Sequence, residues 1–377
     1  MPERKNQHYV PQHYLQGWST DDYIGIYHLE KRDLPTTHTS NVCSKDYLYG
    51  QPPHIESALG KLEEIQHEPL ASLRSGDSLN ELSNSELMLL LSFVMTQRTR
   101  SLFTQKDIEA GDHLLRDGVR DDINNDRYDE YIEWTTELSE DEKIETLVEA
   151  SVLGIHFKHM MLGVLGHFAI QDLEAVMLRN LTNNKFVTSD IPPVFDNPRF
   201  RSQTLAGVSE RGLQIFCPID PTRLLLLYDP AIYSIKSNSQ REVIIKSPSV
   251  VDELNLLQYH NAENIIMHGG NDISYLDRLA DERDSVRRRD SITQEQEIEG
   301  ETYEIDKIPP YQVPGITPDI PGETTRYDIG YTAPRPQSQV NRTKALVSEI
   351  MNRSEGFPDM GLVTAIQFME NLVTEPA

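Results

Sequence analysis

The chain has 377 residues, of which 38% are hydrophobic and 25% charged, a balance that excludes a disordered or an integral membrane protein. Asp and Glu number 60 against 35 Lys and Arg, and the resulting net charge of -25 argues against a whole-surface electrostatic contact with nucleic acid or with an anionic membrane. The only cysteines, Cys43 and Cys217, rule out a disulfide framework and a Cys-x-x-Cys zinc site.

Two further features bear on location. Residues 1–10, MPERKNQHYV, lack the apolar core of a signal peptide. The longest apolar stretch, residues 160–170, is shorter than the ~20 residues that a membrane span needs. We therefore expect a cytoplasmic protein without a membrane partner.

The N-terminal part of the chain predicts a dense polar motif, a strand and two helices. Residues 6–19, NQHYVPQHYLQGWS, crowd His, Tyr, Trp and Gln side chains together, although chain starts are usually loosely ordered. Residues 23–30 alternate in the way of a strand, and residues 52–73 carry an apolar stripe at helical spacing. A capping box, Ser83-Asn84-Ser85-Glu86, predicts that the second helix begins there.

The middle of the chain changes from helical to strand-like patterns. Residues 107–138 predict one or two polar helices, and a second capping box, at residues 139–142, predicts a long helix that reaches about residue 180. Short apolar runs then predict the strands of a small sheet, at residues 184–195, 212–219, 223–229 and 241–247. The second and third of these strands form a hairpin over Asp220-Pro221-Thr222.

A helical pattern returns after these strands. Residues 247–269 predict this helix, with a cap formed by Ser249 and Asp252 and an end at Gly269-Gly270. Together the elements predict an α+β fold: a mostly helical N-terminal half packed on a small antiparallel or mixed sheet, followed by an extended Pro-rich C-terminal tail.

Beyond about residue 285 the chain is expected to leave this core. Seven prolines between residues 309 and 336 exclude regular helix and central strand there. We therefore divide the chain into an α+β domain over residues 1–285, an extended acidic and Pro-rich linker over 286–340, and two short helices over 341–377.

The last predicted helix has one apolar face, formed by Leu362, Ile366, Met369 and Val373. Such a face must bury against this chain, a second copy or another protein. We expect it to fold back on this chain, and the alternative is that the C-terminal helices recruit a protein partner or self-associate.

Five short motifs, in chain order, resemble the bacterial and archaeal family called domain of unknown function 4238. They are QHYVPQHYL at residues 7–15, Ile55-Glu56 with an acidic residue one heptad on (Glu63 or Glu64), Gln97-x-x-Arg100, the strand end from Phe186 to Pro192, and CPIDPTRLLLLYD at residues 217–229. The resemblance covers about residues 6–270 and departs from the family pattern at Ile191, where Asn is frequent. It implies an organisation rather than a known activity, together with a place in prokaryotic defence.

The residues at these motif positions are polar, whereas motifs that only form a core would be apolar. The candidate site residues are His8, Gln12, Glu56, Glu63, Gln97, Arg100, Ser189 and Asp190. If the N-terminal segment packs over the strand end at residues 188–190, an imidazole, carboxylates and a guanidinium converge. His8, Glu56 and Asp190 would then act as acid, base or ligand.

In the same arrangement, substrate contacts would come from Gln12, Gln97, Arg100 and Ser189, with Arg100 as the clamp for an anion. A divalent cation is a candidate cofactor at such a site, and no metal ligand is assigned.

Two interpretations of this set remain open. The polar residues form a catalytic pocket, or they form a buried network that pins the N-terminus, with Asp190 capping a turn through its own backbone region. The pair His156-x-x-His159, with His167 further along, matches no known metal-ligand pattern, so core or surface histidines are favoured there.

The leading function hypothesis is a hydrolase, nuclease-like and metal-assisted, that acts on a phosphorylated or nucleic-acid-type substrate. The alternative is a non-catalytic binding protein whose polar network is structural and whose tail recruits a partner. A solvent-open pocket shared by His8, Glu56, Arg100 and Asp190 would favour the enzyme, and burial with mutual hydrogen bonds would favour the binding protein.

Overall fold

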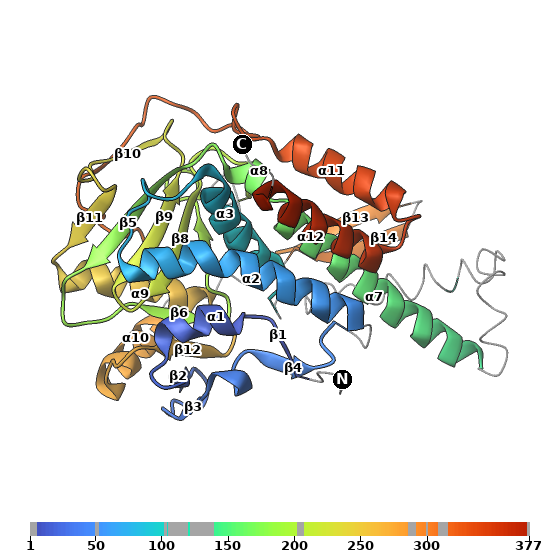
Figure 1. Cartoon of the computed structure of the whole chain (residues 1–377), viewed down its shortest axis with the longest axis horizontal. Coiled ribbons are helices and arrows are strands. Elements are labelled where there is room, and N and C mark those ends of the chain that lie inside the picture. The colour runs from blue at the N-terminus through green and yellow to red at the C-terminus, as the bar shows by residue number, and fades with distance from the viewer. Residues whose placement is uncertain are drawn as a thin grey trace.

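A computed structural model describes residues 6–49, 53–101, 104, 120, 139–201, 207–285, 292–298, 301–307 and 316–374. Figure 1 shows helices packed on one side of a five-stranded sheet, with a second, four-stranded sheet at the lower edge of the view. The predicted α+β class is therefore confirmed. Among the described residues, no helix combines the length and the apolar character that crossing a membrane demands.

The helical layer contains four main helices: α2 (Pro53–Ser75), α3 (Asn84–Thr99), α7 (Glu140–Val164) and α12 (Pro358–Thr374). Both predicted capping boxes are present, with Ser83 before α3 and Ser139 before α7 each accepting from the N–H of the Glu three residues on. The predicted polar helices at residues 107–138 lie almost wholly outside the described residues.

The five-stranded sheet has the order β11-β5-β9-β8-β7. Its strands are β5 (Glu174–Asn180), β7 (Val194–Asp196), β8 (Gln214–Asp220), β9 (Arg223–Tyr228) and β11 (Glu242–Ile245). Only β11 and β5 pair in parallel, and β8 and β9 form the predicted hairpin. The sheet is therefore mixed.

The four-stranded sheet has the order β3-β2-β12-β6 and is antiparallel throughout. Its strands are β2 (Tyr23–His28), β3 (Thr36–His38), β6 (Val187–Ser189) and β12 (Ile265–His268). The helix α9 (Pro248–Asn261) contacts β6 of this sheet and β7 and β11 of the other.

Smaller elements complete the molecule. The N-terminal segment contains β1 (Asn6–His8), which pairs with β4 (Ser44–Asp46), and the short helix α1 (Gln12–Leu15). The others are α8 (His167–Ile170), α10 (Ile273–Ser285), α11 (Val340–Arg353), and the strand pairs β10 (Tyr233–Ile235) with β15 (Glu323–Thr325) and β13 (Ile292–Ile298) with β14 (Glu301–Lys307).

The prediction of one helix from residue 139 to about residue 180 is wrong. α7 ends at Val164, and β5 occupies the last part of the predicted helix. β5 lies between β11 and β9, so its middle residues 175–178 are buried on both faces and form an unbroken apolar run. Such a run has no alternation that would separate it from a buried helix.

The prediction of one helix over residues 247–269 is wrong for the same reason. α9 ends at Asn261, and β12 lies between β2 and β6. The expected cap at Ser249 is absent, because Ser247 precedes the helix and makes no capping hydrogen bond. Gly269 and Gly270 follow β12 rather than a helix, and Gly270 has a φ of +105°.

The predicted strand over residues 184–195 is two strands in two different sheets. β6 joins the four-stranded sheet and β7 the five-stranded sheet, with Pro192 and Pro193 between them. Proline cannot donate to a ladder, so the pair of prolines separates the strands.

The C-terminal part packs on the rest of the molecule. Leu362, Ile366 and Met369 are buried in the main core with α2 and α7, which confirms that the last helix folds back, and the side chain of Val373 lies outside the described residues. Within the predicted linker, β13, β14 and β15 are formed and Arg335 is buried. The division of the chain at residue 285 stays a prediction.

Candidate functional site

The N-terminal segment is held against the strands that follow α8. The Tyr14 hydroxyl donates to the Pro218 carbonyl oxygen at 2.7 Å and lies 2.7 Å from Thr188 Oγ1. The N-terminal segment therefore packs against the strand end at residues 188–190, which is the condition set for the convergence of the motif residues. The crowded aromatic side chains at the chain start therefore serve, in part, as core.

Arg74, in the last turn of α2, closes the C-terminal end of α1. Its guanidinium donates to the carbonyl oxygens of His13 at 2.7 Å, Tyr14 at 2.8 Å and Ile219 at 3.1 Å. The sequence does not reveal that Arg74 holds α1, because a lone arginine at a helix end carries no motif. The contact fixes α1, which carries Gln12, against α2.

Arg100, directly after α3, lies at the centre of what we call the N-terminal site. It is 2% exposed, and its guanidinium donates to the Tyr49 hydroxyl at 2.8 Å, to Glu63 Oε1 at 2.6 Å and to the His8 carbonyl oxygen at 2.5 Å. The acidic partner is therefore Glu63 rather than Glu64. Tyr49 was not among the predicted residues, since no motif surrounds it.

His8, Gln12 and Glu56 lie toward the solvent side of this site. The His8 imidazole is half-buried, and Gln12 is exposed with its Nε2 3.3 Å from His8 Nε2. Burial lowers the pKa of His8 more than the Glu63 carboxylate raises it, so the imidazole is uncharged at pH 7. Glu56 is half-buried one heptad before Glu63, on the same face of α2.

Gln97 lies one turn before Arg100 on α3. It is 1% exposed, and within the described part of the chain neither its amide oxygen nor its amide nitrogen has a hydrogen-bond partner. Gln66 on the adjacent α2 is equally buried but donates to Ser92 Oγ at 3.2 Å. Gln97 therefore presents an unsatisfied amide edge inside the protein, which is costly for a fold to retain.

Two neutral histidines border the same region. Burial, helped by Arg74, lowers the pKa of His13 to about 3, and its Nε2 has no hydrogen-bond partner among the described residues. His156 on α7 packs against the ring of Tyr49 with 5.8 Å between centroids, and burial lowers its pKa to about 4. Both rings are uncharged at pH 7.

The described histidines and acids do not assemble a metal centre. Over the described ranges, no three His, Cys, Asp or Glu side chains converge as ligands. His156 and His167 are buried, and His159 Nδ1 lies 2.9 Å from the Ile155 carbonyl oxygen.

Ser189 and Asp190, at the end of β6, form a second group. Asp190 Oδ1 and Oδ2 accept from the backbone N–H groups of Glu263 at 2.9 Å and Asn264 at 2.8 Å, and Ser189 Oγ donates to Gln258 Oε1 at 3.0 Å. The hydrogen bonds of both side chains go to α9, to the turn after it or to their own segment. None of these hydrogen bonds reaches His8, Gln12 or Arg100, although burial, the Cys43 thiol and the Asp190 carboxylate together raise the pKa of Tyr9 in the N-terminal segment.

A row of amides on α9 holds the segment that contains both residues. Asn255, Gln258 and Asn261 follow one another at a spacing of three and therefore share a face of the helix. Their side chains bond backbone groups of residues 185–193 at 2.7 to 3.2 Å. Amides on a helix are typical of an exposed face, so the sequence does not reveal this row.

Asp190 is 2% exposed and has the geometry of a turn cap. Burial raises the pKa of Asp190 to about 6, although the N–H groups of Asn264 and Glu263 act in the opposite direction. The cap differs from the expected one, because Asp190 accepts from the distant turn at residues 263–264 and not from its own turn.

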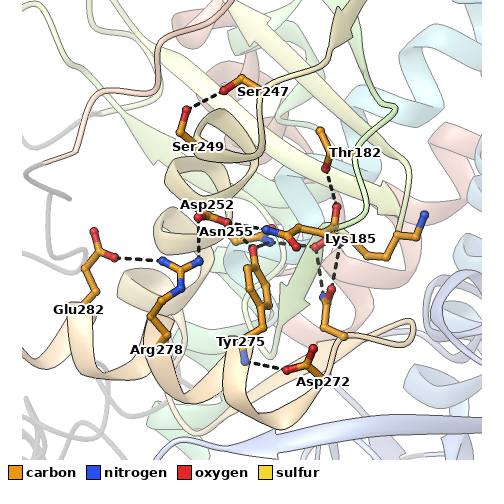
Figure 2. Close-up of polar contacts among 12 residues, drawn as sticks. Thr182, Lys185, Ser247, Ser249, Asp252, Asn255, Asp272, Tyr275, Arg278 and Glu282 are labelled. Carbon is orange, nitrogen blue, oxygen red and sulfur yellow. Dashed lines mark hydrogen bonds and ion pairs between the residues drawn. The ribbon is translucent and has the colours of Figure 1, made fainter.

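Figure 2 shows how α9 is tied to α10. Asp252 accepts from the Tyr275 hydroxyl at 2.8 Å and from Arg278 Nη2 at 2.7 Å, and Asn255 Nδ2 donates to the same hydroxyl at 2.9 Å. Asn255 also donates to the carbonyl oxygen of Lys185 at 2.9 Å. The cluster thus joins α10, α9 and the start of β6.

A cleft of about 490 Å³ opens near the turn that Asp190 caps. It is lined by His28, Leu29, Glu30, Lys31, Glu263, Asn264 and Arg283. The predicted site residues do not line it. Since the N–H groups of Glu263 and Asn264 bond Asp190, this carboxylate lies behind the wall of the cleft rather than in it.

Comparison with known proteins adds one match. A family described as "Protein of unknown function (DUF4238)" matches residues 6–272, which include every predicted site residue. Searches of curated proteins and of solved structures found no match.

Proposed function

The chain belongs to the family of proteins of unknown function DUF4238, and on that premise we propose that it is a binding protein that takes a small polar ligand in the N-terminal site. The site is formed by the N-terminal segment, α2 and the end of α3. His8, Gln12, Glu56, Gln97 and Arg100, predicted from the sequence, all belong to it.

The observation that carries this proposal is the amide of Gln97. A buried donor or acceptor without a partner costs about 1–3 kcal/mol. Arg100, one turn away, is buried to the same degree yet bonds three partners. Proteins retain a destabilising group where function requires that group. A ligand that forms hydrogen bonds with the Gln97 amide would explain why it is retained.

Access to the site is supported by the exposure of its outer residues. Gln12 is exposed, His8 is half-buried, and the Glu63 side chain is 25% exposed although it bonds the buried Arg100. A ligand entering beside these three residues meets Arg100 next. We assign Asp190 and Ser189 to positioning of the strand end, because their side chains are engaged elsewhere.

The test is the melting temperature of the protein with a panel of small polar compounds, including inorganic phosphate, nucleosides, nucleotides and carboxamides. A ligand at one hundred times its Kd adds about 2.7 kcal/mol, which raises the melting temperature by several degrees. Gln97→Met should abolish the rise and Gln66→Met should retain it. A rise that persists in Gln97→Met would place the ligand elsewhere.

A second candidate is the hydrolase predicted from the sequence, and His8 favours it. An uncharged imidazole on the solvent side of a polar site can accept a proton from water at pH 7. Phosphodiesterase and phosphatase assays, with and without divalent cations, test this candidate. Activity that His8→Gln lowers by about 100-fold or more would support catalysis, and a variant as active as the wild type would remove His8 from it.

A further inference from the structure

We propose that the ligand presents a neutral, planar amide-like edge to Gln97, a hydrogen-bond donor beside an acceptor, as nucleobases and carboxamides do. This inference rests on the proposed function of the N-terminal site and specifies the chemical group of the ligand that the site recognises.

The unsatisfied group has a defined shape. The Gln97 side chain offers an N–H donor and a carbonyl acceptor side by side in one plane, and both are buried without a partner in the described structure. A carboxylate offers only acceptors, so it would satisfy the nitrogen and leave the oxygen of Gln97 facing another oxygen. An amide-like edge pairs with both atoms at once.

The charges near Gln97 favour an uncharged ligand. The guanidinium of Arg100 is already matched by the Glu63 carboxylate at 2.6 Å. His8, His13 and His156 are uncharged at pH 7, because burial lowers the pKa of each. Arg74, at the C-terminal end of α1, already donates to three backbone carbonyl oxygens. Among the described side chains, an anion beside Gln97 and Arg100 would therefore meet no unmatched cation to offset its desolvation.

The surroundings of Gln97 on α3 are apolar. Phe93 precedes Gln97 by one turn, and its ring lies 6.1 Å from the His13 ring and 5.5 Å from the Tyr14 ring, measured between centroids. Phe93 and Tyr14 are fully buried, and an apolar interior disfavours a charged ligand more than a neutral one. The unpaired Nε2 of His13 adds one more group that can pair with a polar edge.

The experiment is isothermal titration calorimetry of the full chain with matched probes. Adenosine and nicotinamide carry the edge. Purine riboside lacks the exocyclic amino donor of adenosine, nicotinic acid replaces the amide by a carboxylate, and inorganic phosphate is an anion without a planar amide-like edge. We expect adenosine or nicotinamide to bind, and its altered counterpart to bind about 5- to 150-fold more weakly, the range for one to three kcal/mol.

The two variants sharpen this result. Gln97→Met should bind the intact probe as weakly as its altered counterpart, while Gln66→Met should keep the discrimination of the wild type. Because the probe series is measured on the wild type, the test does not depend on either variant folding. Binding of adenosine alone assigns the edge to a nucleobase, and binding of nicotinamide alone assigns it to a carboxamide.

The outcomes separate this inference from the proposed function. Binding of phosphate or nicotinic acid in preference to the neutral probes, lost in Gln97→Met, would overturn the inference and leave the ligand site standing. Equal binding of intact and altered probes by the wild type would also overturn it. Absence of binding by every compound of both panels would overturn the two proposals together.

Discussion

Gln97 and Gln66 form a matched pair on adjacent helices, equally buried, and only one of them is satisfied by the protein itself. This difference in hydrogen bonding has consequences for the stability of the protein as well as for ligand binding. Burying a polar group is favourable only when its hydrogen bonds are made.

We expect Gln97→Met to keep or raise the free energy of unfolding, by up to about 1–3 kcal/mol, because the unpaired amide is removed. Gln66→Met should lower the free energy of unfolding by about 1 kcal/mol, because Ser92 loses a donor. Urea unfolding of the ligand-free protein measures both. Equal losses in the two variants would show that Gln97 is satisfied in solution.

Asp190 gives a prediction that depends on pH. Its pKa is raised from 3.8 to about 6 by burial, so its contribution to stability is full below pH 3.8 and is lost as the pH rises through 6. The loss amounts to about 3 kcal/mol at 1.36 kcal/mol per pH unit. In Asp190→Asn this loss is absent.

We therefore expect the stability of Asp190→Asn, relative to the wild type, to improve by about 2.4 kcal/mol between pH 4 and pH 7. Chemical unfolding at the two pH values measures this change. Ser189→Ala, next to it in the same network, has no titrating group and should differ from the wild type by the same amount at both. A parallel pH response of Asp190→Asn and the wild type would contradict the raised pKa.

At the scale of elements, the N-terminal segment joins three parts of the fold. Tyr14 reaches β6 and β8, and Arg74 of α2 bonds the end of α1. The position of His8 and Gln12 therefore depends on contacts made by neighbouring residues of the same segment.

We expect Tyr14→Phe to lower the free energy of unfolding by about 1–3 kcal/mol, because the buried Pro218 carbonyl and Thr188 hydroxyl lose their partner. Tyr23→Phe is the control, since Tyr23 is 54% exposed and a surface change stays within about 0.5 kcal/mol. Thermal unfolding compares the two. A Tyr14→Phe variant as stable as the control would mean that the segment is held by packing alone.

The elements that the sequence predicted well are those with local signals. The capping boxes at Ser83 and Ser139 fixed where α3 and α7 begin, and the turn at Asp220 marked the β8–β9 hairpin. β5 and β12 could not be separated from helices, because central strands are apolar on both faces and their partners are distant in the sequence.

The candidate site was predictable to the same extent. Hydrogen bonds join Arg100 to Glu63 and to the His8 backbone, and Gln12 lies beside His8, while the sharing of one site by the motif residues stays a prediction. The hydrogen bonds of Ser189 and Asp190 run to α9 and to the turn after it, which no local pattern connects to them.

At the scale of the whole molecule, the C-terminal part outside the family match is built into the same core. α12 buries its apolar face against α2 and α7, and Asp359 lies 3.1 Å from His54 at the start of α2. α2 also carries Glu56 and Glu63, so the extension supports one wall of the N-terminal site.

We expect Ile366→Ala to lower the free energy of unfolding by about 2–5 kcal/mol, the cost of a cavity in a core. Met360→Ala, on the same helix but 48% exposed, should stay within about 0.5 kcal/mol. A single unfolding transition that shifts in Ile366→Ala would show that α12 unfolds together with the main domain. Two transitions, with only one shifted, would instead support the predicted division at residue 285.

The strand order of the four-stranded sheet also determines how late during synthesis the fold can be completed. β12 pairs with β2 so that Ile265 lies opposite His28, and β6 completes the sheet on the other side of β12. At a translation rate of about 5–20 residues per second, β2 waits roughly 10 to 50 seconds for this partner to be made. Throughout that interval the nascent chain carries an exposed apolar strand edge, so a chaperone that shields β2 on the ribosome would raise the yield of folded protein.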